Sequence, residues 1–521
     1  MPSSFHSTAP LLAEIFSLHA KWRSNNAAVV FGEQKLNWHE LCAANHQLAH
    51  GLINSGLVVG NRVGVVMTNG IPMLQTIMAC MAAGVVSVPI NLSVNDDALV
   101  NMMNDAGISA LIVSDDQLAR VEPLLPLMPS SLKINIAATA NNQCWQSIGT
   151  LCADQSTELP VIHYSASDAL NIIYSSGTTG MPKGIVHTQA GRRDWAYDLA
   201  LALRYDDSAK TLITLGLYSN ISWVAMLSTL LVGGTVYIHS RFDQHEFLAT
   251  VQREAITHTA MVPIQYQRII DCMQTQSYDV SSMRSMMSCG SPLHSDLKRK
   301  IFASFPCGII ELYGLTEGII TTLSPEDADG RWSSVGKPLM GTDIAIVDDN
   351  DQWLESGSSG EIISRGRITM AGYFNRPDAN QESLLIDSQG RHWLRSGDIG
   401  YVDEEGFLYI VDRKKDMILS GGQNIYPQDI ESIVIQHPLV TEVAVIGAKS
   451  HQWGETPVAL VVKNNNHNDN TVDEIKQWAN QQLGRQQRLA DVILIDELPR
   501  NPNGKILKRE LRKSHQSYVY D

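Results

Sequence analysis

The sequence predicts an α/β protein: a large N-terminal domain of mainly parallel α/β sheets with a small antiparallel β unit, followed by a small α+β C-terminal domain. Three observations support this prediction. In the first part of the chain, continuous apolar strands alternate with helical patterns, which is typical of a parallel sheet covered by helices on both faces. After about Trp332 the strands are shorter and are separated by turn residues. From Arg413 onward, the remaining helices and strands could form a compact unit of their own.

The strand–helix alternation is clearest in two early stretches. The first has predicted strands at 62–68, 85–90 and 110–113 and predicted helices at 72–83 and 97–106. The second has predicted strands at 210–214 and 235–239 and predicted helices at 224–231 and 244–254. The small antiparallel unit has predicted strands at 343–347, 360–364, 400–403 and 406–411. The C-terminal unit has predicted helices at 427–436 and 472–481, predicted strands at 442–447, 457–463 and 491–494, and a polar loop at 464–470. The charged segment Asp412–Asp416 lies between the antiparallel strands and the C-terminal α+β unit. We therefore predict an N-terminal domain of residues 1–412 and a C-terminal domain of residues 413–521.

Composition excludes several classes of protein. The 521 residues include 39 Lys and Arg against 54 Asp and Glu, a net charge of −15 that argues against a nucleic-acid partner. The longest apolar stretch, 76–90, is shorter than the run of about 18 residues that spans a bilayer, so we expect no integral membrane segment. Seven scattered cysteines without a CxxC pair, and an N-terminus with Glu14 where a signal would be apolar, predict a cytoplasmic protein with reduced thiols. The oligomeric state, monomer or homodimer, stays open.

The strongest local signal is the segment Tyr174–Gly184, YSSGTTGMPKG, which directly follows a predicted strand at 169–174. Its glycines and small hydroxyl residues let backbone N–H groups fold around phosphate oxygens, and Lys183 adds a cation. It is not a Walker A sequence, because Lys183 is followed by Gly184. A lone loop of this kind is more often a flexible surface turn, but its length and its terminal Pro-Lys-Gly favour a phosphate loop.

Four further segments carry candidate site residues. Glu317, at the end of YGLTE (Tyr313–Glu317), follows a predicted strand at 308–312 and is placed to hold Mg²⁺, although a lone glutamate there is more often a helix-start carboxylate. Asp398 could accept hydrogen bonds from ribose hydroxyls, although Gly-Asp is usually only a turn. The glycine turn 421–427 permits close approach of a ligand. Lys505 ends a loop held by two prolines, where a lysine is normally just a solvated charge.

The order and spacing of these five segments resemble, over essentially the whole chain, the adenylate-forming enzyme superfamily of acyl-CoA synthetases, peptide-synthetase adenylation domains and luciferases. Acyl-CoA synthetases are the most similar branch. The resemblance extends to Gly290-Ser291-Pro292, Gly360-Glu361, Gly372-Tyr373 and Asp412-Arg413. It implies a two-step reaction, in which the carboxylate of an acid attacks the α-phosphorus of ATP to give an acyl-adenylate and pyrophosphate, and a thiol then displaces AMP. Bringing two anions together makes charge neutralisation and positioning the main needs.

The resemblance also implies roles for single residues. Lys505 would bridge the acid's carboxylate and the α-phosphate, Thr316 would contact the α-phosphate, and Glu317 would bind Mg²⁺. Asp398 and Arg413 would hold the ribose. The residues that hold the β- and γ-phosphates would be Ser175, Ser176, Gly177, Thr178, Thr179, Gly180 and Lys183. The residues around the adenine, with Tyr313 stacked on the base, would be Gly290, Ser291, Pro292, Glu311, Leu312, Tyr313 and Gly314.

A mobile C-terminal domain is also implied by the resemblance. A hinge at Lys415, two residues after Arg413, would rotate this domain between the half-reactions. The rotation would withdraw Lys505 and bring Gly421 and Gly422 to the coenzyme A tunnel. One cleft must exclude water during adenylation and later admit a bulky thiol, which accounts for the need to move.

The predicted acid depends on the loop after the strand at 210–214. Amino-acid-activating relatives carry Asp at the position of Ser219; without that carboxylate a buried ammonium is costly, so an α-amino acid is not expected. Many aryl and fatty relatives carry His there, so Ser219 departs from them as well. The residues expected to bind a mainly apolar acid, fatty or aromatic, are Tyr218, Ser219, Asn220, Trp223 and Leu315. Alternatively, 223–231 is simply a helix face in the core.

Coenzyme A is the favoured thiol, because the turn 421–427 resembles the acyl-CoA synthetase version and the chain ends at Asp521 without a fused carrier domain. The alternative is an acyl-AMP ligase that loads a separate acyl- or peptidyl-carrier protein; such relatives tend to have an insertion that is not seen here. A non-enzymatic adenylate-binding protein is disfavoured, because Lys505, Thr316 and Glu317 are all present.

Overall fold

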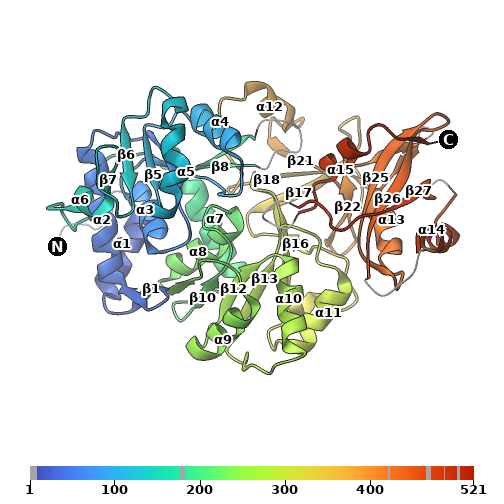
Figure 1. Cartoon of the computed structure of the whole chain (residues 1–521), viewed down its shortest axis with the longest axis horizontal. Coiled ribbons are helices and arrows are strands. Elements are labelled where there is room, and N and C mark those ends of the chain that lie inside the picture. Colours follow the sequence, from blue (N-terminus) through green and yellow to red (C-terminus); the bar gives the residue numbers. More distant parts are fainter. Residues whose placement is uncertain are drawn as a thin grey trace. The chain divides into compact units, whose positions relative to one another are not determined.

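The computed structural model describes residues 9–175, 182–420, 423–464, 471–485, 487–500 and 505–520 (Figure 1). The chain folds into two compact units. The first contains Met1–Asp343 and Arg365–Leu384, and the second contains Ile344–Ser364 and Leu385–Asp521. Each unit has hydrophobic clusters of its own.

Two large sheets form the first unit. Among the described residues, one sheet has nine strands in the order β16 (Lys337–Pro338), β15 (Ile320–Leu323), β14 (Ile310–Gly314), β13 (Ser285–Ser288), β12 (His258–Met261), β10 (Lys210–Ile213), β11 (Thr235–Ile238), β1 (Ala27–Phe31) and β2 (Gln34–Asn37). The other, in the same residues, has eight in the order β19 (Gly372–Tyr373), β9 (Gly184–Thr188), β8 (Ala169–Tyr174), β4 (Val86–Pro89), β3 (Arg62–Val66), β5 (Ala110–Val113), β6 (Ile134–Ala137) and β7 (Gln146–Ser147). Pairing is parallel from β14 to β1 and from β8 to β7, and antiparallel at the edges.

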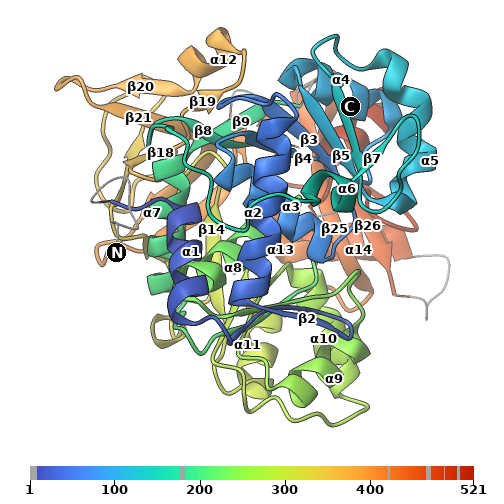
Figure 2. The same ribbon diagram turned by 90° about the vertical axis from the view of Figure 1, so that its left-hand side faces the viewer.

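Helices connect the parallel strands, as parallel pairing requires. Those described in the first unit are α1 (Leu12–Trp22), α2 (Trp38–Asn54), α3 (Ile71–Ala82), α4 (Asp96–Ala106), α5 (Leu118–Val121), α6 (Ile148–Cys152), α7 (Gln189–Ala202), α8 (Asn220–Val232), α9 (Gln244–Glu254), α10 (Pro263–Met273), α11 (Ser295–Ser304) and α12 (Pro377–Glu382). Helix α1 packs beside α2 (Figure 2).

Helices α7 and α8 form a layer between the two sheets (Figure 1). Helix α7 packs on β8 and β9, α8 packs on β10, β11 and β12, and the two helices pack on each other. Each begins at a capping hydroxyl: Thr188 accepts from the Gly191 N–H at 3.0 Å, and Ser219 accepts from the Ile221 N–H at 3.3 Å. The Ser219 cap sets the N-terminus of α8 beside the predicted acid loop, whereas Thr188 pairs with Ala169, at the end of the β8–β9 pair opposite the predicted phosphate loop.

The second unit contains two smaller sheets. The first has β17 (Thr342–Val347), β18 (Gly360–Gly366), β21 (His392–Val402) and β20 (Leu384–Ile386), with β22 (Leu408–Arg413) paired to β21. The second has β24 (Gln423–Ile425), β23 (Ile418–Ser420), β26 (Gly454–Lys463), β25 (Val440–Ser450) and β28 (Val519–Tyr520), with β27 (Asp491–Leu494) paired to β26. Its described helices are α13 (Pro427–Val434), α14 (Thr471–Gln482) and α15 (Lys508–Ser514).

The fold class predicted from the sequence is confirmed. The predicted strands 110–113, 169–174 and 491–494 and the predicted helix 244–254 coincide with β5, β8, β27 and α9. The predicted helix 224–231 begins earlier, at Asn220, because Ser219 caps it. The two compact units divide the chain at other positions than the boundary predicted between residues 412 and 413 from the change in secondary structure, and that boundary stays a prediction. Residues 465–470 of the predicted polar loop lie outside the described residues.

Candidate active site

The base of the predicted phosphate loop is closed by two hydrogen bonds between Ser175 and Lys183. Ser175 N donates to Lys183 O at 3.0 Å, and Lys183 N donates to Ser175 Oγ at 3.4 Å. Both residues flank the antiparallel pair β8 and β9, at the carboxyl end of β8. The predicted phosphate contacts Ser176, Gly177, Thr178, Thr179 and Gly180 lie outside the described residues.

Tyr373 joins the lysine of the phosphate loop to the predicted magnesium carboxylate. Lys183 Nζ lies 4.7 Å from the centre of the Tyr373 ring, and Tyr373 Oη donates to Glu317 Oε1 at 2.9 Å. Burial and the Glu317 charge raise the pKa of the Tyr373 phenol, so it stays protonated and remains a donor. The sequence analysis gave Tyr373 no role, although Gly372-Tyr373 was part of the resemblance.

The carboxylate of Glu317 fits a Mg²⁺ ion that is shared with phosphate oxygens. Tyr373 occupies Oε1 and orients the group, and no partner of Oε2 is present in the described residues. Those residues contain no cluster of three His, Cys, Asp or Glu side chains that could hold a metal ion by themselves. Magnesium sites commonly use one or two carboxylates together with substrate oxygens, and Glu317 with a nucleotide would meet that need.

A buried hydrogen-bond network links the loop of Thr316 to the acid loop. Arg192 donates through Nε to Asn171 Oδ1 at 2.9 Å and through Nη2 to Asn220 Oδ1 at 2.9 Å and His187 Nδ1 at 3.1 Å. Because a guanidinium can only donate, His187 Nδ1 must accept, and Nε2–H therefore donates to Thr316 O at 2.7 Å. Burial and the Arg192 charge hold the pKa of His187 well below its usual range, which keeps the ring neutral.

Arg192 itself is fully buried. Its partners Asn171, His187 and Asn220 are neutral, and its Nη1 has no hydrogen-bond partner among the described residues. Burial lowers the pKa of the guanidinium to about 9, so it is still charged at neutral pH. Its Cζ lies 4.7 Å and 5.1 Å from the ring centres of Trp195 and Trp223, and these aromatic faces partly compensate the charge. The sequence analysis did not single out Arg192 or His187.

The acid loop has a fixed conformation before α8. Tyr218 folds back over Gly216, where a Cβ atom would clash with the tyrosine ring, so only glycine fits. Trp223 is fully buried, and its indole N–H donates to Leu217 O at 2.8 Å. The face 223–231 is buried along its length, as the core alternative predicted, and the role of Trp223 in ending the acid pocket stays a prediction. Leu315 N donates to Ile319 O at 2.9 Å, beside Thr316.

On the predicted adenine side, a buried ion pair joins two segments. Lys298 Nζ lies 2.5 Å from Glu311 Oε2, and Lys298 also donates to Trp332 O at 2.7 Å. Glu311 Oε1 accepts from the Leu293 N–H at 3.3 Å, directly after the turn Gly290-Ser291-Pro292. This turn and the strand that carries Glu311, Leu312, Tyr313 and Gly314 are therefore held together.

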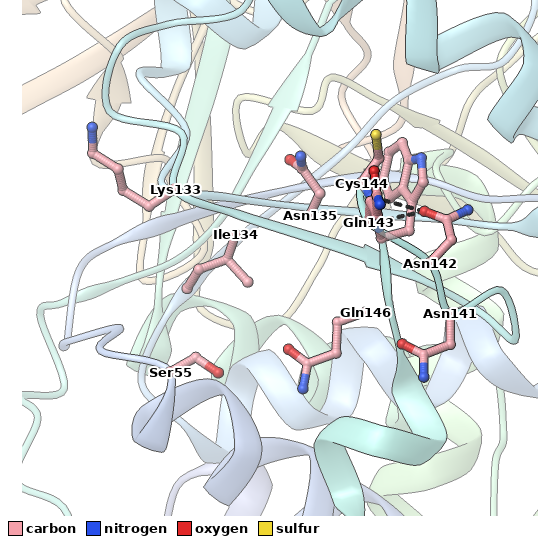
Figure 3. A pocket seen from close by; sticks show the side chains of 10 residues that line it. Ser55, Lys133, Ile134, Asn135, Asn141, Asn142, Gln143, Cys144 and Gln146 are labelled. Carbon is pink, nitrogen blue, oxygen red and sulfur yellow. Dashed lines mark hydrogen bonds between the residues drawn. The ribbon is translucent and has the colours of Figure 1, made fainter.

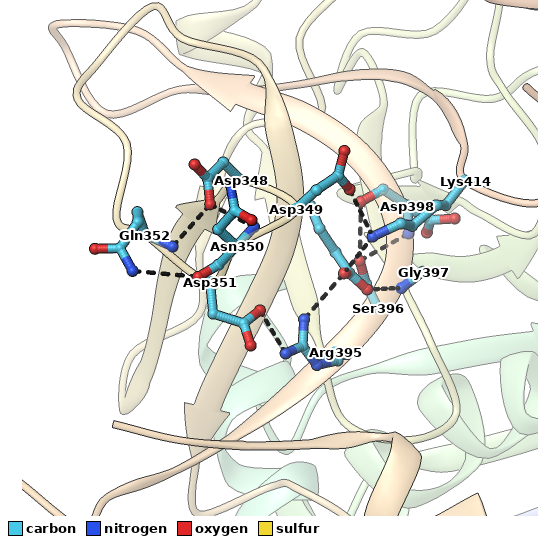
Figure 4. Close-up of polar contacts among 11 residues, drawn as sticks. Asp348, Asp349, Asn350, Asp351, Gln352, Arg395, Ser396, Gly397, Asp398 and Lys414 are labelled. Carbon is cyan, nitrogen blue, oxygen red and sulfur yellow. Dashed lines mark hydrogen bonds and ion pairs between the residues drawn. The ribbon is translucent and has the colours of Figure 1, made fainter. Parts of the chain in front are cut away.

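The predicted ribose residues lie opposite each other on β21 and β22. Asp398 pairs in register with Arg413, and Arg413 Nε lies 3.1 Å from Asp398 Oδ1. Glu361 supports their turn: its Oε1 accepts from the Gly397 N–H at 3.3 Å, and its Oε2 lies 3.2 Å from both Arg395 and Lys414 (Figure 4). Asp398 and Arg413 thus form one rigid corner of the second unit.

The remaining predicted residues of the second unit are described only in part. Lys415 is exposed. Lys505 directly precedes Ile506, which forms an antiparallel bridge with Arg500. The predicted coenzyme A contacts Gly421 and Gly422 lie outside the described residues.

A surface depression of about 320 Å³ lies elsewhere in the first unit (Figure 3). Ser55, Lys133 and the amides of Asn135 and Gln146 line it, and none of the predicted site residues does. Asn142 Oδ1 accepts from the Cys144 and Trp145 N–H groups at 2.8 and 3.0 Å and fixes the loop beside the depression.

No described helix is long and apolar enough to span a membrane.

Comparisons with known proteins show the family of the chain. Residues 16–374 match the family of AMP-binding enzymes, and residues 429–505 match the AMP-binding enzyme C-terminal domain. The chain is 32% identical over 500 residues to feruloyl-CoA synthase of Amycolatopsis sp, covering 95% of this chain and 97% of that one. It is 31% identical over 496 residues to a long-chain-fatty-acid–CoA ligase of Mycobacterium tuberculosis, covering 93% and 94%.

Among solved structures, ATP-bound MatB from Rhodopseudomonas palustris is similar with a TM-score of 0.87 and 25% identity, over 97% of this chain and 99% of that one. The two family matches cover most of the sequence, and the predicted motifs fall inside or between them. The chain therefore belongs to the AMP-binding enzyme family, the adenylate-forming superfamily, and it groups there with AMP-forming acid–CoA ligases.

Proposed function

We propose that the protein is an ATP-dependent acyl-CoA synthetase that activates an apolar carboxylic acid, fatty or aromatic, as acyl-AMP and transfers the acyl group to coenzyme A. The general class, an AMP-forming acid–CoA ligase, follows from the family. The single observation that carries the proposal is the chain of contacts Lys183–Tyr373–Glu317, which brings the cation of the phosphate loop and a magnesium carboxylate to one place.

In the first half-reaction the acid's carboxylate attacks the α-phosphorus of ATP, and pyrophosphate leaves. Both reactants are anions, so lowering their repulsion is the main catalytic need. Lys183 neutralises charge on the β- and γ-phosphates, and Lys505 neutralises charge between the carboxylate and the α-phosphate. Mg²⁺, held by Glu317 and phosphate oxygens, would supply further neutralisation when bound. Thr316 contacts the α-phosphate, and its backbone is held by His187.

In the second half-reaction the coenzyme A sulfur attacks the acyl carbon, and AMP leaves with the bonding electrons of the mixed anhydride. Rotation at Lys415 replaces Lys505 by the turn at Gly421 and Gly422. The ribose remains held by Asp398 and Arg413, because their strand pair lies before the hinge in sequence.

The acid class rests on the loop at the start of α8. Ser219 uses its hydroxyl to cap the helix, and the Asn220 side-chain oxygen accepts from Arg192. The guanidinium of Arg192 is fully buried against the ring of Trp223, which is itself fully buried, and Tyr218 is partly buried. Relatives at nearly equal identity are named for a ferulate substrate and for long-chain fatty acids, so both aromatic and aliphatic acids belong to the proposal.

The alternative is an acyl-AMP ligase that loads a separate acyl- or peptidyl-carrier protein. The relatives named above are coenzyme A ligases, which favours coenzyme A as the acceptor. We also place the enzyme in the cytoplasm, because all seven cysteines lie in described residues and none is paired.

The test is pyrophosphate release with a panel of acids, measured with and without coenzyme A. The panel runs from acetate to palmitate and includes benzoate, cinnamate and alanine. We expect AMP and an acyl-CoA thioester from at least one apolar acid, and no turnover of alanine. Pyrophosphate release without thioester formation would favour a carrier protein as acceptor, and robust turnover of alanine would contradict the predicted acid class.

A further inference from the structure

The proposed hinge residue Lys415 lies inside a turn in which the Asp416 and Met417 N–H groups both donate to Arg413 O, at 2.9 and 3.1 Å, so that rotation there breaks these two bonds. Its side chain is exposed, and within the described part of the chain it makes no hydrogen bond or ion pair. The residues on both sides of it do. This difference matters because rotation at one residue moves a domain as a body only if the chain is rigid immediately before and after that residue.

On the upstream side, Lys414 is anchored three times. Its N–H donates to Gly397 O at 3.0 Å, and its Nζ lies 3.2 Å from Glu361 Oε2 and 3.1 Å from Asp349 Oδ1 (Figure 4). The Glu361 side chain is only 7% exposed, so its pair with Lys414 is partly shielded from solvent. The chain is therefore fixed on the ribose-binding sheet up to the residue before the hinge.

On the downstream side, Asp416 is anchored to α15. Its Oδ1 lies 2.5 Å from Arg512 Nη2, and the two side chains are 22% and 31% exposed. Helix α15 follows Lys505 after two residues. The ion pair thus connects the first residue beyond the hinge to the helix that follows the predicted catalytic lysine, across 96 positions in the sequence.

Helix α15 is in turn fixed to the body of the C-terminal sheet. Leu511 is buried in the cluster formed with β25, and Lys508 Nζ lies 2.7 Å from Glu431 Oε1 on α13. Leu507 N donates to Pro499 O at 2.8 Å and ties the segment directly after Lys505 to Pro499. A displacement of Asp416 is therefore passed through Arg512 to α15 and so to Lys505.

We infer that Arg512 and Asp416 are positioning residues for adenylation: their ion pair couples rotation at Lys415 to the placement of Lys505, while Lys414 and Glu361 hold the other side of the hinge still. This inference rests on the proposed function. Removing the pair leaves Lys505 present and β23 still paired with β24 and β26, but it unties Asp416 from α15, so that Lys505 reaches the α-phosphate less often. Thioester formation, which does not use Lys505, is spared.

The experiment measures both half-reactions separately in Arg512→Met, Arg512→Lys and Asp416→Asn. Adenylation is followed by exchange of pyrophosphate into ATP, and thioester formation is followed from supplied acyl-adenylate and coenzyme A. We expect Arg512→Met and Asp416→Asn to lower adenylation about ten-fold and thioester formation less than about two-fold, with the double variant no worse than either and partial recovery in Arg512→Lys. Arg253→Met, which removes an exposed pair with Glu246 on α9, is the control.

Two outcomes overturn the inference: adenylation at the wild-type rate in Arg512→Met, or equal loss in both half-reactions, which marks a structural role alone. Lys415→Pro tests the proposed hinge independently, because proline fixes φ. We expect it to spare adenylation and cripple thioester formation. If Lys415→Pro turns over like the wild type while Arg512→Met behaves as expected, the hinge fails and the positioning role of Arg512 stands.

Discussion

Arg192 Nη2 donates to His187 Nδ1 at 3.1 Å, and this contact fixes the remaining ring proton of His187 on Nε2, where it binds Thr316 O. The same guanidinium nitrogen reaches Asn220 at the start of α8. One buried cation thus sets the positions of the loop assigned to the α-phosphate and the loop assigned to the acid. The network explains why a charged residue is kept in the layer between the two sheets, where burial is costly.

Arg192→Lys is expected to keep the charge and lose the network. The planar guanidinium of Arg192 reaches acceptors on Asn171, His187 and Asn220, which a single lysine ammonium cannot do. Each buried acceptor left without a donor costs about 1–3 kcal/mol of stability. We expect kcat/KM for adenylation to fall ten-fold or more, where each ten-fold corresponds to about 1.4 kcal/mol of lost transition-state stabilisation. The unfolding midpoint should also be lower. Arg193→Lys on the same helix is the control, since Arg193 pairs with its neighbour Asp194 near the surface. Wild-type adenylation in Arg192→Lys would contradict the role of the network.

Tyr373→Phe is expected to weaken the use of magnesium. The variant keeps the ring near Lys183 and loses the hydrogen bond to Glu317, and a bond to a charged group contributes about 1.5–3 kcal/mol. We expect the Mg²⁺ concentration for half-maximal adenylation to rise about ten-fold, with a small change in the KM of the acid. Tyr197→Phe, on the exposed side of α7, serves as control. An unchanged magnesium dependence would remove Tyr373 from the site.

Asp412→Asn is expected to stabilise the protein above pH 6. Burial raises the pKa of this carboxyl from 3.8 to about 6, although it accepts from the Gln428 and Arg413 N–H groups. As the pH rises from 4 to 6, Asp412 therefore ionises in the unfolded chain before it ionises in the folded protein. The free energy of unfolding falls by up to about 3 kcal/mol over that window. Asparagine keeps one acceptor and cannot ionise. Unfolding midpoints of the two proteins should converge near pH 4 and separate above pH 6; a less stable variant at pH 8 would contradict this sign.

The length of the acid is tested by Trp223→Leu against Trp195→Leu. Both tryptophans are buried and face Arg192, but only Trp223 follows the predicted acid loop. If Trp223 ends the pocket, each added methylene contributes about 0.8 kcal/mol of burial free energy, so kcat/KM rises with chain length up to a medium length. Trp223→Leu then moves the optimum to longer acids. Trp195→Leu should leave the profile in place. If Trp223→Leu has the same chain-length optimum as Trp195→Leu, Trp223 is a core residue only.

Strands and helices bounded by strong local signals were predictable from the sequence. Strand β8 and helix α9 were predicted with the observed bounds, because one is an apolar run before a glycine loop and the other begins at Asp243, whose Oδ1 accepts from two N–H groups of the first turn. Strands β12 (HTAM) and β13 (SMMS) were not predicted. Each is four residues long and buried throughout, so neither has the alternation or apolar continuity that marks a strand.

The contacts inside the candidate site were less accessible to sequence reasoning. Tyr373 and Glu317 lie 56 positions apart, and Arg192 and Asn220 lie 28 apart, so no local pattern connects them. A single arginine on a helix normally indicates a solvated side chain. The order of the nucleotide motifs gave the enzyme class, whereas the residues that hold those motifs in place became visible only through packing.

The most direct test of the account is Lys505→Ala measured in both half-reactions. Lys505 is assigned to charge neutralisation in adenylation alone, and losing such a contact costs about 10²–10³ in rate. We predict that pyrophosphate exchange into ATP falls by about that factor, while thioester formation from supplied acyl-adenylate stays within about three-fold of the wild type. Equal loss in the two half-reactions, or wild-type exchange, would contradict the two-step assignment.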